Sequence, residues 1–177
     1  MKMTELLIVF GLLAGLASGQ QVRWNSEKLA AKASDSVDVT LDGPMLRLAT
    51  KFLSSEDGDE RQVKKLVAGL KGIYVKSFEF KNTGEYTAAD VESFRAQVRG
   101  PGWDRIVGVH STEEGENVEV YIKSDDGEGK KISGLAIIAA EPKELTLVNI
   151  VGPIDLDTLS DLGGHFGIPE IEADKKK

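Results

Sequence analysis

Apolar residues take every second position in the segment SVDVTLD, where they are Val37, Val39 and Leu41. A period of two predicts a strand with one buried face. Directly after it, apolar residues recur at helical spacing over residues 45–53, and Asp42 is placed to cap that helix. The pattern therefore predicts a strand that turns at once into a helix.

A second helix is predicted over residues 63–70, separated from the first by the polar segment SSEDGDE and ended by Gly72. The segment IYVKSFEFK that follows has the β-branched and aromatic composition of a strand. Its apolar positions change parity between Val75 and Phe78. Either a bulge resets the phase, or this strand is buried on both faces.

The next helix is predicted to begin at Thr87, because Thr87 and Asp90 are spaced as an acidic variant of the capping box. Val91, Phe94 and Val98 then share one helical face. The Gly-Pro-Gly segment that follows is expected to end the helix.

From residue 103 onward the pattern predicts a four-strand meander with hairpin-length connections. In ENVEVYIK, apolar residues alternate with Glu119, Tyr121 and Lys123, so one face of that strand is expected to be solvated. The segments ISGLAIIAA and LTLVNIV are almost continuously apolar, which is typical of central strands covered on both faces. A short helix is predicted over residues 155–162.

Together these elements predict one α+β domain over residues 20–170. Its sheet is mainly antiparallel and ends in the four-strand meander, with the helices packed on one face in a two-layer arrangement. A doubly wound fold is disfavoured, because the late strands are too closely spaced for crossover helices. Residues 171–177 are expected to form a charged, disordered tail.

The first 19 residues have the features of a secretory signal peptide. Lys2 gives a short basic start, residues 6–16 form an apolar run too short to span a bilayer comfortably, and Ala-Ser-Gly ends the segment with small residues. Cleavage near Gly19 is expected, and an uncleaved membrane anchor is the alternative. The protein is therefore predicted to be periplasmic or secreted.

The chain of 177 residues has a formal net charge of −7 and no cysteine. Neither a disulfide nor a thioether-linked lipid can form, so the fold depends on its core. The acidic balance repels nucleic-acid phosphates and anionic lipid surfaces. No nucleic-acid partner is expected, and no membrane insertion after the leader has been removed.

The segment at residues 151–165, VGPIDLDTLSDLGGH, is the most conspicuous candidate for a binding loop. It lacks the glycine spacing of phosphate and dinucleotide loops, and Asp155 and Asp157 disfavour a phosphate at the helix start. A calcium loop is also disfavoured, because Leu159 and Phe166 occupy ligand positions. The segment is interpreted as a strand, a turn and a capped helix.

Catalytic motifs are scarce. The only histidines are His110 and His165, neither in a zinc motif, and no G-x-S-x-G nucleophile motif occurs. Carboxylate pairs such as Asp125-Asp126 fall in predicted turns and are expected to be solvated, whereas catalytic acids usually need burial; weak calcium association with such turns is the alternative. No catalytic residue, metal ligand or cofactor is assigned.

Two tryptophans are the candidate partner-binding residues. Trp103, in GPGWDRIVGV, is interpreted first as core or lid packing, although an exposed tryptophan on that loop would anchor a partner. Trp24 is the one large apolar residue in the polar segment at 20–34, and it is expected to pin this segment to the domain.

Three segments of the C-terminal half carry a family resemblance: GWDRIVGV, ENVEVYIK and, most specifically, GLAIIAAEPKELTLVNIVGPIDLDTLSDLGG. They resemble the family known as domain of unknown function 4252. The resemblance implies an exported bacterial envelope protein, and it transfers no catalytic residues because the family has none established. Many members carry a lipobox cysteine, which this chain lacks.

These observations favour a non-catalytic, exported module that binds a protein or another component of the cell envelope. Two alternatives stay open. One is a hydrolase that uses an unrecognised carboxylate or His110, so the sequence leans away from an enzyme without deciding the question. The other is a membrane-tethered structural protein of the envelope that keeps its leader.

Overall fold

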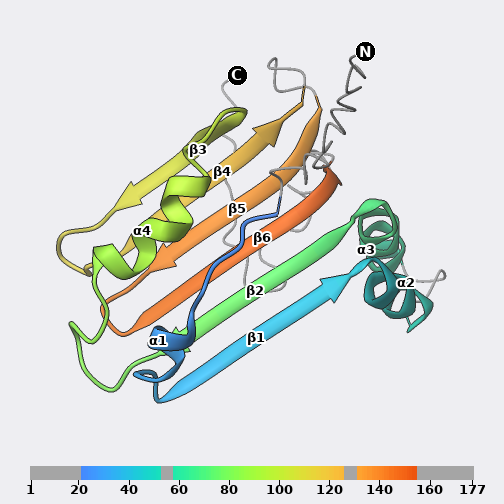
Figure 1. Cartoon of the computed structure of the whole chain (residues 1–177). Coiled ribbons are helices and arrows are strands. Elements are labelled where there is room, and N and C mark those ends of the chain that lie inside the picture. The colour runs from blue at the N-terminus through green and yellow to red at the C-terminus, as the bar shows by residue number, and fades with distance from the viewer. Residues whose placement is uncertain (1–20, 53–57, 126–130, 155–177) are drawn as a thin grey trace, which may run out of the picture.

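The computed structural model describes residues 21–52, 58–125 and 131–154, which form an α+β fold built on one antiparallel sheet (Figure 1). The helices are α1 (Glu27–Ala30), α2 (Gly43–Phe52), α3 (Gly58–Gly69) and α4 (Ala88–Gln97). The strands are β1 (Asp35–Asp42), β2 (Gly72–Glu79), β3 (Trp103–His110), β4 (Asn117–Ser124), β5 (Ile132–Ala140) and β6 (Glu144–Ile154). The predicted leader, the helix at 155–162 and the tail at 171–177 lie outside the described residues.

The strand order is β1-β2-β6-β5-β4-β3, and every neighbouring pair is antiparallel. The last four strands therefore form the predicted meander. β5 and β6 lie in the interior of the sheet, and most of their residues are buried. The prediction that the two most apolar segments are central strands is confirmed.

Both faces of the sheet are apolar, and each carries its own core cluster. The front cluster contains Val22, Leu29, Phe78, Phe80, Val91, Phe94, Val98, Trp103, Tyr121, Ala136, Ile138, Leu145 and Leu147. The rear cluster contains Leu46, Leu70, Val120, Ile122, Ile132, Leu135, Ile137, Ile150 and Ile154. α1 and α4 contribute to the front cluster and α2 to the rear one, so the arrangement of all helices on one face is not confirmed.

The structure shows why the apolar positions of β2 change parity along the strand. Its register with β1 and with β6 is continuous from Gly72 to Glu79, without a bulge. Phe78 belongs to the front cluster, whereas Ile73 packs against the rear one. β2 is therefore the strand with two apolar faces, and the bulge alternative is wrong.

Backbones approach closely where α3 leads into β2. Lys71 N–H donates to the carbonyl of Val151 at 2.7 Å, and a Cβ on Gly152 would lie 2.8 Å from the Cα of Leu70. Gly152 also has φ +132°, a conformation that favours glycine. The predicted end of the second helix is therefore wrong, since α3 ends at Gly69, before Gly72, and β6 continues through Gly152 to Ile154.

Residues 21–26, called the strap, cross the front face of the sheet before α1 (Figure 1). Val22 N–H donates to Asn149 Oδ1 at 2.9 Å, and Asn149 Nδ2 donates to the carbonyl of Leu135 at 3.1 Å. Asn149 is only 2% exposed. One buried amide therefore joins the strap to both central strands.

Replacing Asn149 with alanine is expected to lower the free energy of unfolding by about 1–3 kcal/mol, because it leaves the buried N–H of Val22 without this acceptor. Amide hydrogen exchange at Val22 should lose its protection, and urea unfolding measures the energetic cost. The matched control is Asn82→Ala, since Asn82 makes a surface hydrogen bond to Glu85. Unchanged protection at Val22 would show that Asn149 does not hold the strap.

Candidate functional site

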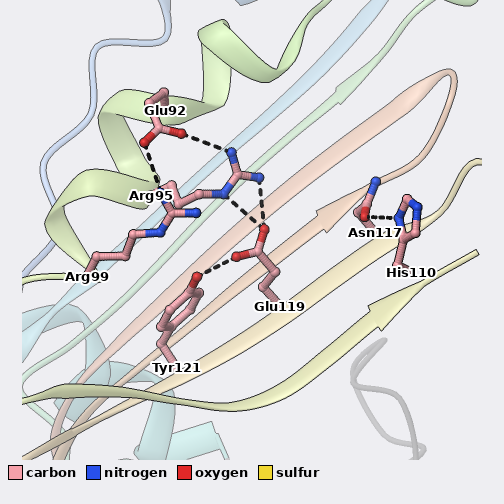
Figure 2. Close-up of polar contacts among 7 residues, drawn as sticks. All are labelled: Glu92, Arg95, Arg99, His110, Asn117, Glu119 and Tyr121. Carbon is pink, nitrogen blue, oxygen red and sulfur yellow. Dashed lines mark hydrogen bonds and ion pairs between the residues drawn. The ribbon is translucent and has the colours of Figure 1, made fainter.

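The most extensive polar cluster among the described residues lies between α4 and β4 on the front face (Figure 2). The guanidinium of Arg95 binds Glu119 Oε1 through Nη2 at 2.9 Å and through Nε at 3.0 Å. Both side chains are largely buried, at 13% and 12% exposed. The hydroxyl of Tyr121 donates to the other carboxylate oxygen, so both oxygens of Glu119 are occupied.

The start of α4 places this cluster. Thr87 N–H donates to Asp90 Oδ2 at 2.8 Å, which is the reach-back half of the predicted capping box. That backbone hydrogen bond lowers the pKa of Asp90. From this start, Val91 and Phe94 point into the front cluster, and Arg95 follows at the edge of the buried face.

An outer ring of charge surrounds the buried pair. Glu92 accepts from Arg95 Nη1 at 3.2 Å and from Arg99 Nη1 at 3.2 Å (Figure 2). The side chains of Glu92 and Arg99 are more than half exposed. Exposed pairs of this kind contribute little to stability, so the energetic weight lies on Arg95 and Glu119.

The pKa values of Glu119 and Tyr121 are both shifted away from neutral pH. Burial alone would raise the pKa of Glu119, but hydrogen bonds from Tyr121 and Arg95 outweigh it and hold that pKa below its usual range. Burial and the neighbouring Glu119 carboxylate raise the pKa of Tyr121. A general acid or base works best with a pKa near the working pH. The arrangement is suited to fastening α4 onto β4.

The prediction that one face of β4 is solvated is wrong. Tyr121 is 3% exposed and belongs to the front cluster, and Glu119 is paired with Arg95. α4 covers this face and brings the countercharge that a buried carboxylate requires.

His110 is exposed and lies at the end of the edge strand β3. Its Nδ1 lies 2.6 Å from Oδ1 of Asn117, the residue paired with it on β4. Glu113 and Glu114 are solvent-exposed in the next turn. His165 lies outside the described residues.

Within the described ranges, no three His, Asp or Glu side chains are grouped closely enough to hold a metal ion. No helix in this part of the chain is long and apolar enough to cross a membrane. A cavity of about 30 Å³ lies under the strap, lined by Val22, Trp24, Tyr74, Lys76, Phe94, Leu147 and Asn149. Its volume suits one or two water molecules.

Both candidate tryptophans pack into the front cluster. Trp103 is 8% exposed and lies over Gly134, where an added Cβ would come within 3.2 Å of its ring. Trp24 meets the rings of Phe78 and Phe94 edge-on, with centroids 5.8 and 6.0 Å apart. The packing interpretation of Trp103 and the pinning role of Trp24 are confirmed, whereas partner binding by either one stays a prediction.

Large apolar side chains do remain exposed, and three of them lie on one helix. Met45 and Leu48 of α2 are each 46% exposed and Phe52 is 81% exposed, whereas Leu46 is 2% exposed. Met45, Leu48 and Phe52, here called the α2 stripe, share one helical face because they are spaced by three and four residues. The sequence contains this spacing, but the sequence-based interpretation did not identify it as an exposed surface.

Comparison with known protein families gives a match over most of the chain. The family model for a domain of unknown function (DUF4252) matches residues 31–162, which leaves the strap outside the match. No curated protein matches the chain. Since the family model covers most of the sequence, the chain belongs to the DUF4252 family.

Proposed function

We propose that the protein is an exported, non-catalytic module that binds a component of the cell envelope through the α2 stripe. The supporting observation is the exposure of Met45, Leu48 and Phe52 on one helical face. Single exposed apolar residues are ordinary, but contiguous ones mark interaction surfaces. The occupied carboxylate of Glu119 also favours a structural role for the buried polar cluster.

Site-specific photocrosslinking in native cells tests this function. A photoreactive phenylalanine analogue at position 52 is expected to give a discrete adduct. The matched control position is Val109, which is 50% exposed on the edge strand β3. Equal labelling from both positions, or no adduct from either, would contradict the proposal. N-terminal sequencing tests export separately, with a mature chain beginning near Gln20 as the expected result.

A further inference from the structure

We propose that the α2 stripe docks onto an anionic lipid surface, with its apolar side chains at the headgroup boundary and its basic side chains against the lipid phosphates. This inference rests on the proposed function and names the partner of the same surface. It is carried by the stripe, by the charge around it and by the place of α2 in the fold.

The exposed surface of α2 is divided between apolar and basic residues. Arg47 and Lys51 are exposed, and Lys51 lies one turn from Leu48. α2 contains no acidic residue, since Asp42 precedes it as the cap and accepts from Met45 N–H at 3.2 Å. Leucine and phenylalanine beside lysine and arginine make up the composition of helices that lie in a membrane interface.

The segment that follows Asp42 and contains α2 and α3 has a charge opposite in sign to that of the whole chain. Residues 43–71 hold six Lys and Arg against four Asp and Glu, a net charge of +2. The rest of the chain therefore has a net charge of −9, which gives −7 for the whole chain. Electrostatic screening acts over roughly 8–10 Å at physiological ionic strength, whereas an eight-residue strand such as β1 spans about 26 Å. Acids at the far end of the sheet therefore do not cancel the local attraction. The general repulsion predicted from the net charge is therefore not expected at this end of the molecule.

The fold presents α2 at one extreme. Figure 1 shows α2 and α3 together beyond the end of β1 and the beginning of β2. The strap joins the sheet on this half too, because Val22 binds Asn149, which pairs with Tyr74 near the start of β2. The described chain thus begins on the half of the sheet that carries α2.

A protein partner fits these residues less well. Cores of protein–protein interfaces are depleted of lysine, which is expensive to desolvate, whereas a lipid headgroup layer receives lysine and arginine at its phosphates. A flexible lysine stem also lets the apolar side chains sink while its ammonium stays in the polar layer. The α2 stripe consists of three side chains on a helix of 10 residues, which is far too short to span a bilayer but can lie along its surface.

Vesicle flotation tests the proposal with the chain from Gln20 onward, which contains every described element. Vesicles of 70% phosphatidylcholine and 30% phosphatidylglycerol are expected to bind the protein, and pure phosphatidylcholine vesicles to bind it much more weakly. Binding to the anionic vesicles should fall as salt rises. Lys51→Gln should weaken it about fivefold, the equivalent of one basic residue at the membrane surface.

The double variant Leu48→Ser/Phe52→Ser should abolish flotation, whereas the matched control Val109→Ser should leave it unchanged. Near-UV circular dichroism of Trp24 and Trp103 verifies that each variant keeps its fold. Equal binding to both kinds of vesicle, or none to either, would overturn the lipid assignment. A self-association that Leu48→Ser/Phe52→Ser removes, without vesicle binding, would instead assign the stripe to a second copy.

The two proposals fail in different ways. A protein adduct from position 52 without vesicle binding leaves the binding module in place and overturns the lipid assignment. Absence of both the adduct and vesicle binding overturns the two together.

Discussion

Replacing Phe94 with alanine is expected to lower the free energy of unfolding by about 3–5 kcal/mol, the cost of truncating a fully buried aromatic side chain. Phe94 is 3% exposed in the front cluster, where its ring meets that of Trp24 edge-on. The variant leaves a void beneath both α4 and the strap. Urea unfolding followed by far-UV circular dichroism measures the loss.

Phe52→Ala is the matched control, because it makes the same chemical change at a residue that is 81% exposed. Its free energy of unfolding should stay within about 0.5 kcal/mol of the parent. A large loss at position 52 would mean that the α2 stripe belongs to the core, and would remove the surface on which the binding proposal depends.

Replacing Arg95 with methionine is expected to cost about 3 kcal/mol at neutral pH, because the buried carboxylate of Glu119 loses its countercharge. Glu92→Gln is the control, since it removes only the exposed contacts of the outer ring and should cost less than about 1 kcal/mol. The double variant Arg95→Met/Glu119→Leu should recover much of the loss, as it leaves no unpaired charge. If the double variant is no more stable than Arg95→Met, the pair is not the source of the effect.

The same pair should make stability depend on pH in the acid range. The folded-state pKa of Glu119 lies below its usual value, so in acid the unfolded chain binds more protons than the folded one. The stabilisation is therefore complete above the unfolded-state pKa, about 4.3, and is lost as the pH falls through the folded-state pKa. Unfolding measured from pH 7 to pH 3 should show the parent and Arg95→Met converging. A constant difference would contradict the ionic origin.

Local sequence patterns were sufficient to predict an element where the residue spacing is compatible with only one kind of secondary structure. The alternation of Val37, Val39 and Leu41 identified β1 as a strand, although its predicted buried face is only partly covered and Val37 is 53% exposed. The spacing of Thr87 and Asp90 identified the start of α4. Continuous apolar runs identified β5 and β6 as interior strands, since only a strand covered on both faces tolerates them.

The same patterns could not reveal what covers a face. Periodicity shows that Glu119 and Tyr121 lie on one side of β4, but α4 and Arg95 decide whether that side is dry. Helical spacing groups Met45, Leu48 and Phe52 identically whether they are buried or exposed. In the structure Leu46 takes the buried side of α2 and leaves the other three at the surface. Coverage is a tertiary property, so both the polar cluster and the α2 stripe required the structure.

Pairing between distant strands was equally beyond the sequence. β2 lies between β1 and β6, so half of its partners come from the last described strand. Hydrophobic pattern specifies which faces must be buried, and several strand orders satisfy it.

The hydrogen bond from Val22 to Asn149 can form only late in synthesis, because 127 positions separate the two residues. A nascent chain holding only β1 and β2 has a two-stranded ribbon, which is marginal in water by itself. β2 cannot join the rest of the sheet until β6 has been made, because β6 lies between β2 and β5. Pairing of strands so far apart in the sequence is slow. The two halves of the sheet are therefore joined only after nearly the whole polypeptide has been synthesised, and the front cluster is completed in that last step.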